Sequence, residues 1–142
     1  MKVLVLNGPN LNMLGARDKN HYGELSLDSI EILLESEFPE IKFEFTQSNL
    51  EGELVEQIQK APSYFDAIII NPGGYSHTSV AIRDALEICI IPKIEVHLSN
   101  LAEREEFRNK SITAAKTMGC ISGFKEHSYS AAVYLLVKLL KK

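Results

Sequence analysis

Residues 65–79 read Phe-Asp-Ala-Ile-Ile-Ile-Asn-Pro-Gly-Gly-Tyr-Ser-His-Thr-Ser. The apolar, β-branched run at 65–70 predicts a buried strand, and the helical spacing of apolar residues at 80–88 predicts a helix. Between them, a glycine pair and a Ser/Thr cluster offer backbone N–H groups at the positive end of that helix, where anions bind. Asn71 and His77 add side-chain donors. The stretch therefore predicts a binding site for a small acid.

Strand-like and helix-like segments alternate along the chain. Strands are predicted at 2–6, 42–47, 65–70, 92–98 and, weakly, 120–124, and helices at 30–35, 53–60, 80–88, 102–108 and 128–140. Such alternation favours βαβ units joined by right-handed crossovers. We expect an α/β, flavodoxin-like, doubly wound five-stranded parallel sheet of order 2-1-3-4-5, forming a single domain over residues 1–142. A ligand would then lie over the carboxyl ends of strands 1, 3 and 4.

Composition excludes several classes of protein. The net charge is -4 and no basic stripe is present, which argues against a nucleic-acid partner. No apolar run approaches the ~20 residues of a membrane helix. Because a strand is predicted from residue 2, we expect no signal peptide and a cytoplasmic location. Cys89 and Cys120 lie in apolar surroundings without metal-ligand spacing, so we expect buried thiols rather than a disulfide.

The long connection after the first strand contains Arg17 and Tyr22. A tyrosine ordinarily titrates near ~10, and a neighbouring guanidinium lowers its pKa by stabilising the phenolate. Arg17 could therefore activate Tyr22 as a base. The alternative is a tyrosine packed on the surface beside an unrelated arginine. Asn10 also has two interpretations: it could form a turn or bind a ligand.

Glu95 and His97 are two residues apart on a predicted buried strand, so their side chains project from the same face. A buried ionised group is costly unless it is paired. Glu95 could hold His97 in one tautomer and so make it a general acid, or the pair could simply join parts of the core. Ser99, just beyond, could bind an anion or cap the next helix.

Arg104 and Arg108 are one helical turn apart, a spacing that suits a bidentate grip on a carboxylate. The flanking glutamates could instead neutralise them on a solvated helix. No lysine falls at the carboxyl end of strands 1, 3 or 4, which makes a Schiff base unexpected. The absence of a Cys/His/Asp cluster from the sequence pattern speaks against a metal.

Taken in order, these segments resemble type II 3-dehydroquinate dehydratase, a metal-free enzyme family of the shikimate pathway. The resemblance is carried by residues 7–15, Arg17 with Tyr22-Gly23, and residues 71–79, 94–100 and 104–108. It implies dehydration of 3-dehydroquinate to 3-dehydroshikimate without a cofactor or metal. It also implies a homododecamer built from trimers.

The resemblance also implies residue roles. Tyr22 would remove a proton beside the substrate ketone, and Arg17 would keep Tyr22 ionised. Asn10 would help to hold a water against the enolate oxygen. His97 would protonate the departing hydroxyl, with Glu95 orienting it. The implied substrate-binding positions are Asn71, His77, Leu98, Ser99 and Arg108, with Asp84 reaching the site of a neighbouring subunit.

One segment departs from the family pattern. The chain has Arg17-Asp18-Lys19 where the family usually has Arg-Glu-Pro, so a fixed φ angle is lost from this loop. Among other classes, a phosphate-accepting receiver module would need acidic residues where Asn7 and Asn71 stand. A flavin-binding protein would need a hydroxyl-rich loop after the first strand, and an inactive relative would not be expected to retain Arg17, Tyr22 and His97.

Overall fold

Five parallel strands form a sheet of order β2-β1-β3-β4-β5 in the computed structural model, which describes residues 1–16, 20 and 25–141. The strands are β1 (Lys2–Asn7), β2 (Lys42–Gln47), β3 (Ala67–Asn71), β4 (Lys93–His97) and β5 (Cys120–Ser122). The predicted fold class and strand order are confirmed. The reversal of strand order lies between β1 and β3, so a crevice is expected beyond their carboxyl ends.

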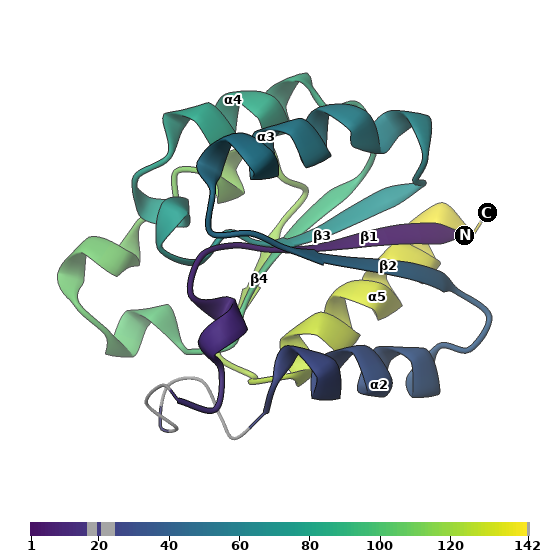
Figure 1. The fold of residues 1–142 in the computed structure, drawn as a ribbon, viewed down its shortest axis with the longest axis horizontal. Helices are drawn as coiled ribbons and strands as arrows, with labels where there is room; N and C mark the ends of the chain where they lie inside the picture. Colours follow the sequence, from purple (N-terminus) through teal and green to yellow (C-terminus); the bar gives the residue numbers. More distant parts are fainter. Residues whose placement is uncertain (17–19, 21–24, 142) are drawn as a thin grey trace.

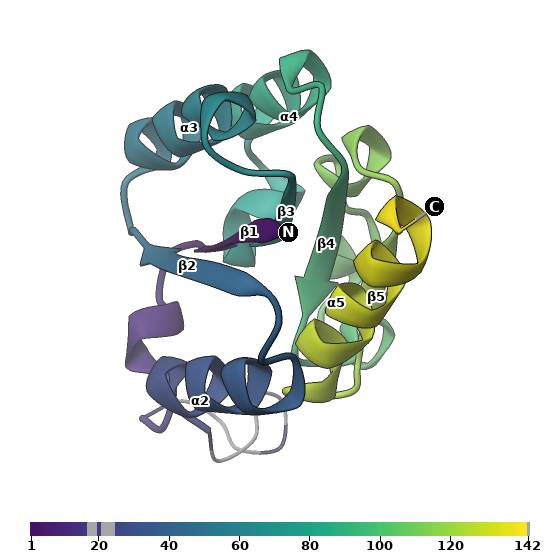
Figure 2. The ribbon, with the colours of Figure 1, turned by 90° about the vertical axis from the view of Figure 1, so that its right-hand side faces the viewer.

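Helices cover both faces of the sheet (Figures 1 and 2). Helices α3 (Glu51–Lys60) and α4 (Val80–Ile88) lie on one face, and α2 (Leu27–Glu37) and α5 (His127–Leu140) lie on the other. Side chains alternate along a strand, so the central strands β1 and β3 contribute to two cores. Leu4 and Leu6 pack with α3 and α4, whereas Val3 and Val5 pack with α2 and α5. This two-sided burial explains why β1 and β3 read as continuous apolar runs.

Local details differ from the prediction in two places. The predicted helix at 102–108 is wrong: the structure has two short 3-10 turns, Leu101–Glu103 and Glu106–Asn109, separated at Arg104, whose backbone is extended. The Asn100 side chain accepts a hydrogen bond from the Ala102 backbone N–H and starts the first turn. Helix α3 begins at Glu51, so Gly52 lies inside it rather than before it.

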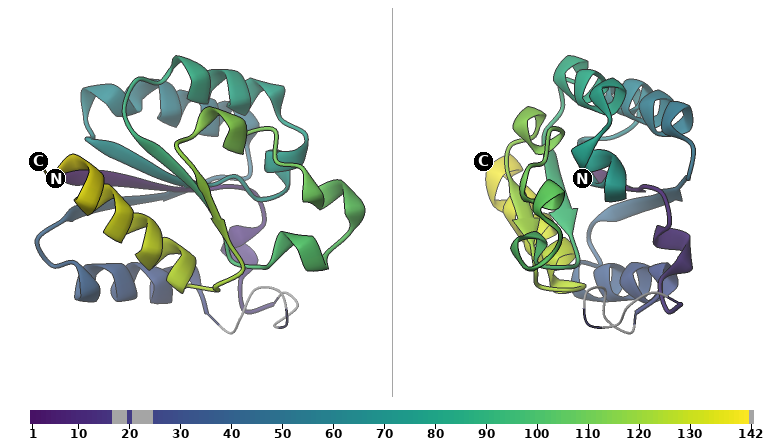
Figure 3. Two further views of the ribbon diagram at one scale, coloured as in Figure 1. Left: turned by 180° about the vertical axis from the view of Figure 1, so that it is seen from behind. Right: turned by 90° about the vertical axis from the view of Figure 1, so that its left-hand side faces the viewer.

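After β4 the chain extends beyond the carboxyl ends of the strands and then returns to the start of β4, so that β5 can run parallel to it (Figure 3). This segment carries the two 3-10 turns and a third one, Ala114–Lys116. In the part of the chain that the structure describes, no helix has the length and apolar character needed to cross a bilayer.

The carboxyl ends of β1 and β3 approach each other closely. The Gly8 N–H donates to the Asn71 carbonyl oxygen at 2.7 Å, and a Cβ atom on Gly8 would lie 2.7 Å from the carbonyl carbon of Pro72. Only glycine fits there. Tyr129 of α5 lies across this junction: its hydroxyl donates to Asn7 Oδ1 at 2.6 Å and accepts from Asn71 Nδ2 at 3.0 Å. One buried phenol therefore connects two strands and a helix.

Tyr129→Phe should destabilise the fold by roughly 1–3 kcal/mol, because it leaves polar groups of Asn7 and Asn71 buried without their partner. Urea unfolding at fixed protein concentration measures the change. Tyr134→Phe is the matched control, since Tyr134 is on the same helix and 55% exposed. Equal unfolding midpoints for the two variants would contradict a structural role for the Tyr129 hydroxyl.

Candidate functional site

A pocket opens at the carboxyl ends of the sheet, where the reversal of strand order predicts a binding site. Residues after β1, β3 and β4 all contribute to its lining. The polar side chains at its wall are Asn10, Asn71, His77, His97, Arg104 and Arg108. Four of these six are histidines or arginines, so the pocket suits an anionic ligand.

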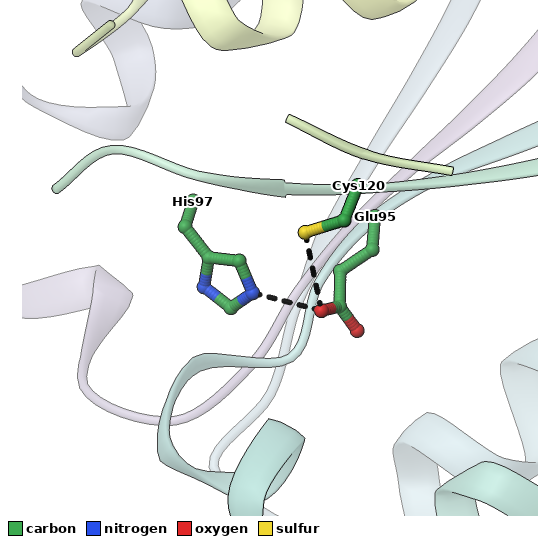
Figure 4. Close-up of side chains that lie close together, drawn as sticks. All are labelled: Glu95, His97 and Cys120. Atoms are coloured by element: carbon green, nitrogen blue, oxygen red, sulfur yellow. Dashed lines mark hydrogen bonds and ion pairs between the residues drawn. The ribbon is translucent and has the colours of Figure 1, made fainter. Parts of the chain in front are cut away.

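Glu95 and His97 form a buried pair, as both sequence-based interpretations require. His97 Nε2 lies 2.9 Å from Glu95 Oε2, and the two side chains are 6% and 0% exposed (Figure 4). An ionised carboxylate can only accept, so Nε2 carries the proton. The other ring nitrogen, Nδ1, points away from Glu95 in Figure 4. Because His97 also lines the pocket, the pair can act there as an oriented imidazole.

The Glu95 carboxylate is held by more donors than His97 alone. Ser111 Oγ donates to Oε2 at 2.7 Å, and the Thr113 hydroxyl donates to Oε1. Burial opposes ionisation, but the hydrogen bonds and the charge of His97 outweigh it, so the pKa of Glu95 is lowered from its ordinary value. Ser111 and Thr113 carry no signal in the sequence, because single hydroxyl residues in an irregular segment are commonplace.

Cys120 also contacts this carboxylate. Its Sγ lies 3.6 Å from Glu95 Oε2, and burial of the thiol together with the charge of Glu95 raises the pKa of Cys120 to about 12. The residue as a whole is exposed, so the prediction of a buried Cys120 is wrong, whereas Cys89 is buried as predicted. The exposure arises because β5 is the edge strand of the sheet.

His77 faces His97 across the pocket. The two rings are nearly parallel, with centroids 6.4 Å apart, and Phe107 packs edge-on against His77. His77 Nδ1 lies 2.8 Å from the Lys110 carbonyl oxygen, which can only accept. Nδ1 therefore carries a proton, and Nε2 is left for a ligand.

Arg104 and Arg108 both line the pocket although they are not on one helix. Arg108 pairs with Glu105, and its guanidinium carbon lies 4.9 Å from the centre of the Phe107 ring. Arg108 thus has the glutamate partner that one alternative expects, although not on a helix, and it borders the pocket; its grip on a carboxylate stays a prediction. The stacking on Phe107 and the pairing with Glu105 limit its orientations.

The glycine-rich turn after β3 forms a 3-10 helix, Gly73–His77, before α4 begins. Gly73 and Gly74 line the pocket. Ser79 caps α4 by accepting from the Ile82 N–H at 2.9 Å, and Ser76 Oγ donates to the Gly73 carbonyl oxygen. The Ser76 and Ser79 hydroxyls therefore form hydrogen bonds within the turn and the helix cap. The polar groups that face a ligand are mainly those of other side chains.

The remaining predicted site residues are placed as follows. Asn10 lines the pocket with its backbone in the left-handed region, at φ 69°. Leu98 lines the pocket, whereas Ser99 is buried and is not among the described lining residues. Asp84 is exposed on α4, away from this pocket. Arg17 and Tyr22 lie outside the residues that the structure describes.

Sequence spacing did not reveal one grouping that the fold creates. Glu95, His97 and Cys120 each bring one potential metal-ligand atom, and these atoms lie within 4.8 Å of one another. The sequence spacing indicated no cluster of metal-ligating residues, but the fold brings these three together. The cause is the pairing of Glu95 with Cys120 in the parallel register of β4 and β5.

Comparison with known proteins agrees with the geometry. The family model described as dehydroquinase class II matches residues 1–137. A 3-dehydroquinate dehydratase of Caldicellulosiruptor bescii is 51% identical, with 98% of each chain covered. One from Aliarcobacter butzleri is 46% identical over 100% of this chain and 88% of its own. A crystal structure of type II dehydroquinase from Butyrivibrio crossotus superposes with a TM-score of 0.92 at 46% identity, covering 96% of this chain and 97% of the other. The chain therefore belongs to the dehydroquinase class II family, the type II 3-dehydroquinate dehydratases.

Proposed function

We propose that the protein, as a single catalytic domain, dehydrates 3-dehydroquinate to 3-dehydroshikimate in the shikimate pathway, through an enolate and without a Schiff base or metal. The observation that carries the proposal is the buried Glu95–His97 pair at a pocket bordered by Arg104 and Arg108. Its relatives bear the name 3-dehydroquinate dehydratase. The substrate is an anion with a carboxylate and several hydroxyls, which suits a pocket lined by cations and amides.

The reaction needs a base and an acid at neighbouring carbons. Tyr22, as phenolate beside Arg17, takes the proton from the carbon next to the ketone, and the electron pair forms an enolate. The enolate then forms the carbon–carbon double bond as the hydroxyl leaves, protonated by His97 to give water. A water held with the help of Asn10 stabilises the enolate oxygen.

Glu95 orients His97 for this protonation. A carboxylate that accepts from Nε2 fixes the ring, and the donors Ser111 and Thr113 fix the carboxylate in turn. The described residues that line the pocket include no lysine, which supports chemistry without a Schiff base.

Substrate binding is assigned to five positions. Arg108 grips the carboxylate, and Asn71, His77, Leu98 and Ser99 bind the ring hydroxyls or adjoining atoms. For His77, the free Nε2 supports this role, because Nδ1 is engaged by the Lys110 carbonyl. For Asn71, the Tyr129 and Gly73 contacts fix the amide in one orientation.

We assign the assembly as a homododecamer of trimers in which Asp84 reaches a neighbouring site. Asp84 lies on α4 four residues from Val80 and four from Ile88, so the three share one face. Val80 is 59% exposed and Ile88 is 73% exposed. Exposed apolar side chains beside Asp84 support coverage of this face by another subunit.

Tyr22→Phe should fold normally and lose turnover by about a hundredfold or more, because the phenylalanine ring cannot accept the substrate proton. Steady-state assays with 3-dehydroquinate measure the loss. Tyr64→Phe is the control, since Tyr64 is 66% exposed and remote from the pocket. A Tyr22→Phe rate close to that of the unmodified protein would remove Tyr22 from the role of base.

Arg108→Ala should raise KM by roughly 10- to 100-fold, the loss expected for hydrogen bonds to a charged group. Arg108→Lys should recover only part of the affinity, because an ammonium keeps the charge but not the two-pronged geometry. Initial rates over a range of substrate concentrations separate KM from kcat. If KM stays unchanged in Arg108→Ala, the carboxylate is bound elsewhere.

Pure protein with a chelator should convert 3-dehydroquinate to a product with the ultraviolet absorption of a conjugated enone acid. Borohydride added with substrate should leave the activity intact, because no lysine adduct forms. Mass spectrometry of the treated protein provides the second readout. A reduced lysine adduct, or loss of activity with the chelator, would contradict the proposed chemistry.

A further inference from the structure

Three unlike ligand groups, the Glu95 carboxylate, the His97 imidazole and the Cys120 thiol, converge where β4 pairs with β5. Glu95 and His97 come from β4, and Cys120 is the register partner of Glu95 on β5. Figure 4 shows the imidazole and the thiol directed at the same carboxylate oxygen, Oε2. His97 Nε2 is 2.9 Å from that oxygen and Cys120 Sγ is 3.6 Å from it. The three atoms lie within 4.8 Å of one another.

These separations match a tetrahedral zinc ion. Zinc binds nitrogen and oxygen at about 2.0–2.2 Å and sulfur at about 2.3 Å, so two of its ligands lie roughly 3.3–3.6 Å apart. The observed 2.9 Å and 3.6 Å bracket that range, and His97 Nε2 and Cys120 Sγ, within 4.8 Å of each other, would have to move closer together to admit the ion. Thiolate, imidazole and carboxylate are the ligand types that zinc takes in proteins.

Glu95 is the fixed ligand of the cluster, and Cys120 is the ligand nearest to solvent. Glu95 is fully buried and is held by Ser111 and Thr113, which orient it as supporting groups around metal ligands do. Cys120 lies on the edge strand, where the residue is exposed although its thiol is partly buried, so an ion would approach along that edge of the sheet. Three protein ligands leave a fourth position for water.

We propose that Glu95, His97 and Cys120 form an inhibitory zinc site. The ion would replace the proton on His97 Nε2 and the proton on Cys120 Sγ, both of which now point to Glu95. With its Nε2 lone pair bound to zinc, the imidazole can no longer become the doubly protonated acid. Zinc binding stands independently of the reaction, whereas its inhibitory effect rests on the proposed role of His97.

The binding test uses chelator-treated protein and no substrate. Calorimetric titration with zinc chloride should give one ion per protomer. Replacement by cobalt(II) chloride should give the near-ultraviolet charge-transfer absorption of a thiolate–cobalt bond. Cys120→Ala should lose that absorption and bind zinc at least about tenfold more weakly. Cys89→Ala is the matched control and should retain both, because Cys89 is buried in the core between the sheet, α3 and α4.

Cys120→Ser serves as a second variant with nearly unchanged shape, and the same losses are expected. The zinc site is excluded if the unmodified protein binds no stoichiometric zinc. It is equally excluded if the cobalt absorption persists in both Cys120 variants, or disappears in Cys89→Ala.

The activity test compares each variant with and without zinc. Excess zinc should suppress dehydration by the unmodified protein and by Cys89→Ala, and should suppress Cys120→Ala far less at the same concentration. Equal inhibition of all three would overturn the inhibitory role. A protein that binds zinc through Cys120 but never turns over 3-dehydroquinate would refute the proposed function and leave the binding site established.

Discussion

The buried charge of Glu95 is the constraint on which the site depends. Removing an ionised carboxylate from water costs several kcal/mol, and only close donors offset that cost. Here the donors are His97, Ser111, Thr113 and, more weakly, Cys120. Three of these four lie between residues 111 and 120, in the segment leading into β5 and at its start. That segment therefore fixes the carboxylate that in turn orients the imidazole.

The topology of the sheet explains why the other groups meet at the same place. Asn7 and Asn71 are register partners on β1 and β3, and the chain leaves those two strands on either side of the reversal in strand order. Beyond the ends, the connections supply Asn10, His77 and the two arginines to one pocket. Among the described residues, cationic and amide side chains thus line the pocket, and the buried Glu95 carboxylate binds the His97 side chain from behind.

Much of the fold was predictable because it depends on local patterns. Helix α4 starts and ends where its apolar spacing indicates, and the capping by Ser79 reinforces the start. The Glu95–His97 pairing follows from strand alternation alone. The prediction of a helix at 102–108 failed. The Asn100 side chain caps only a short 3-10 turn, and the extended backbone at Arg104 ends that turn.

Other parts of the site depend on contacts that no local pattern encodes. Ser111 and Thr113 acquire significance only once the chain brings them against Glu95. The position of Cys120 follows from the register of β4 with β5, and its exposure follows from the lack of a strand beyond β5 in the sheet. The assignments of Arg17 and Tyr22 came from their place in one loop and from family resemblance, and they remain predictions, since both lie outside the described residues.

The hydroxyl of Tyr129 joins Asn7 across 122 positions of sequence. During synthesis, the hydrogen bonds between the Tyr129 hydroxyl and the Asn7 and Asn71 amides therefore cannot form until α5 has left the ribosome. Such distant contacts slow folding, because the closure entropy of a long loop must be overcome first. A chain cut just before α5 would retain every described residue that lines the pocket, yet Asn7 and Asn71 would lack their shared partner until the first turn of α5 had docked.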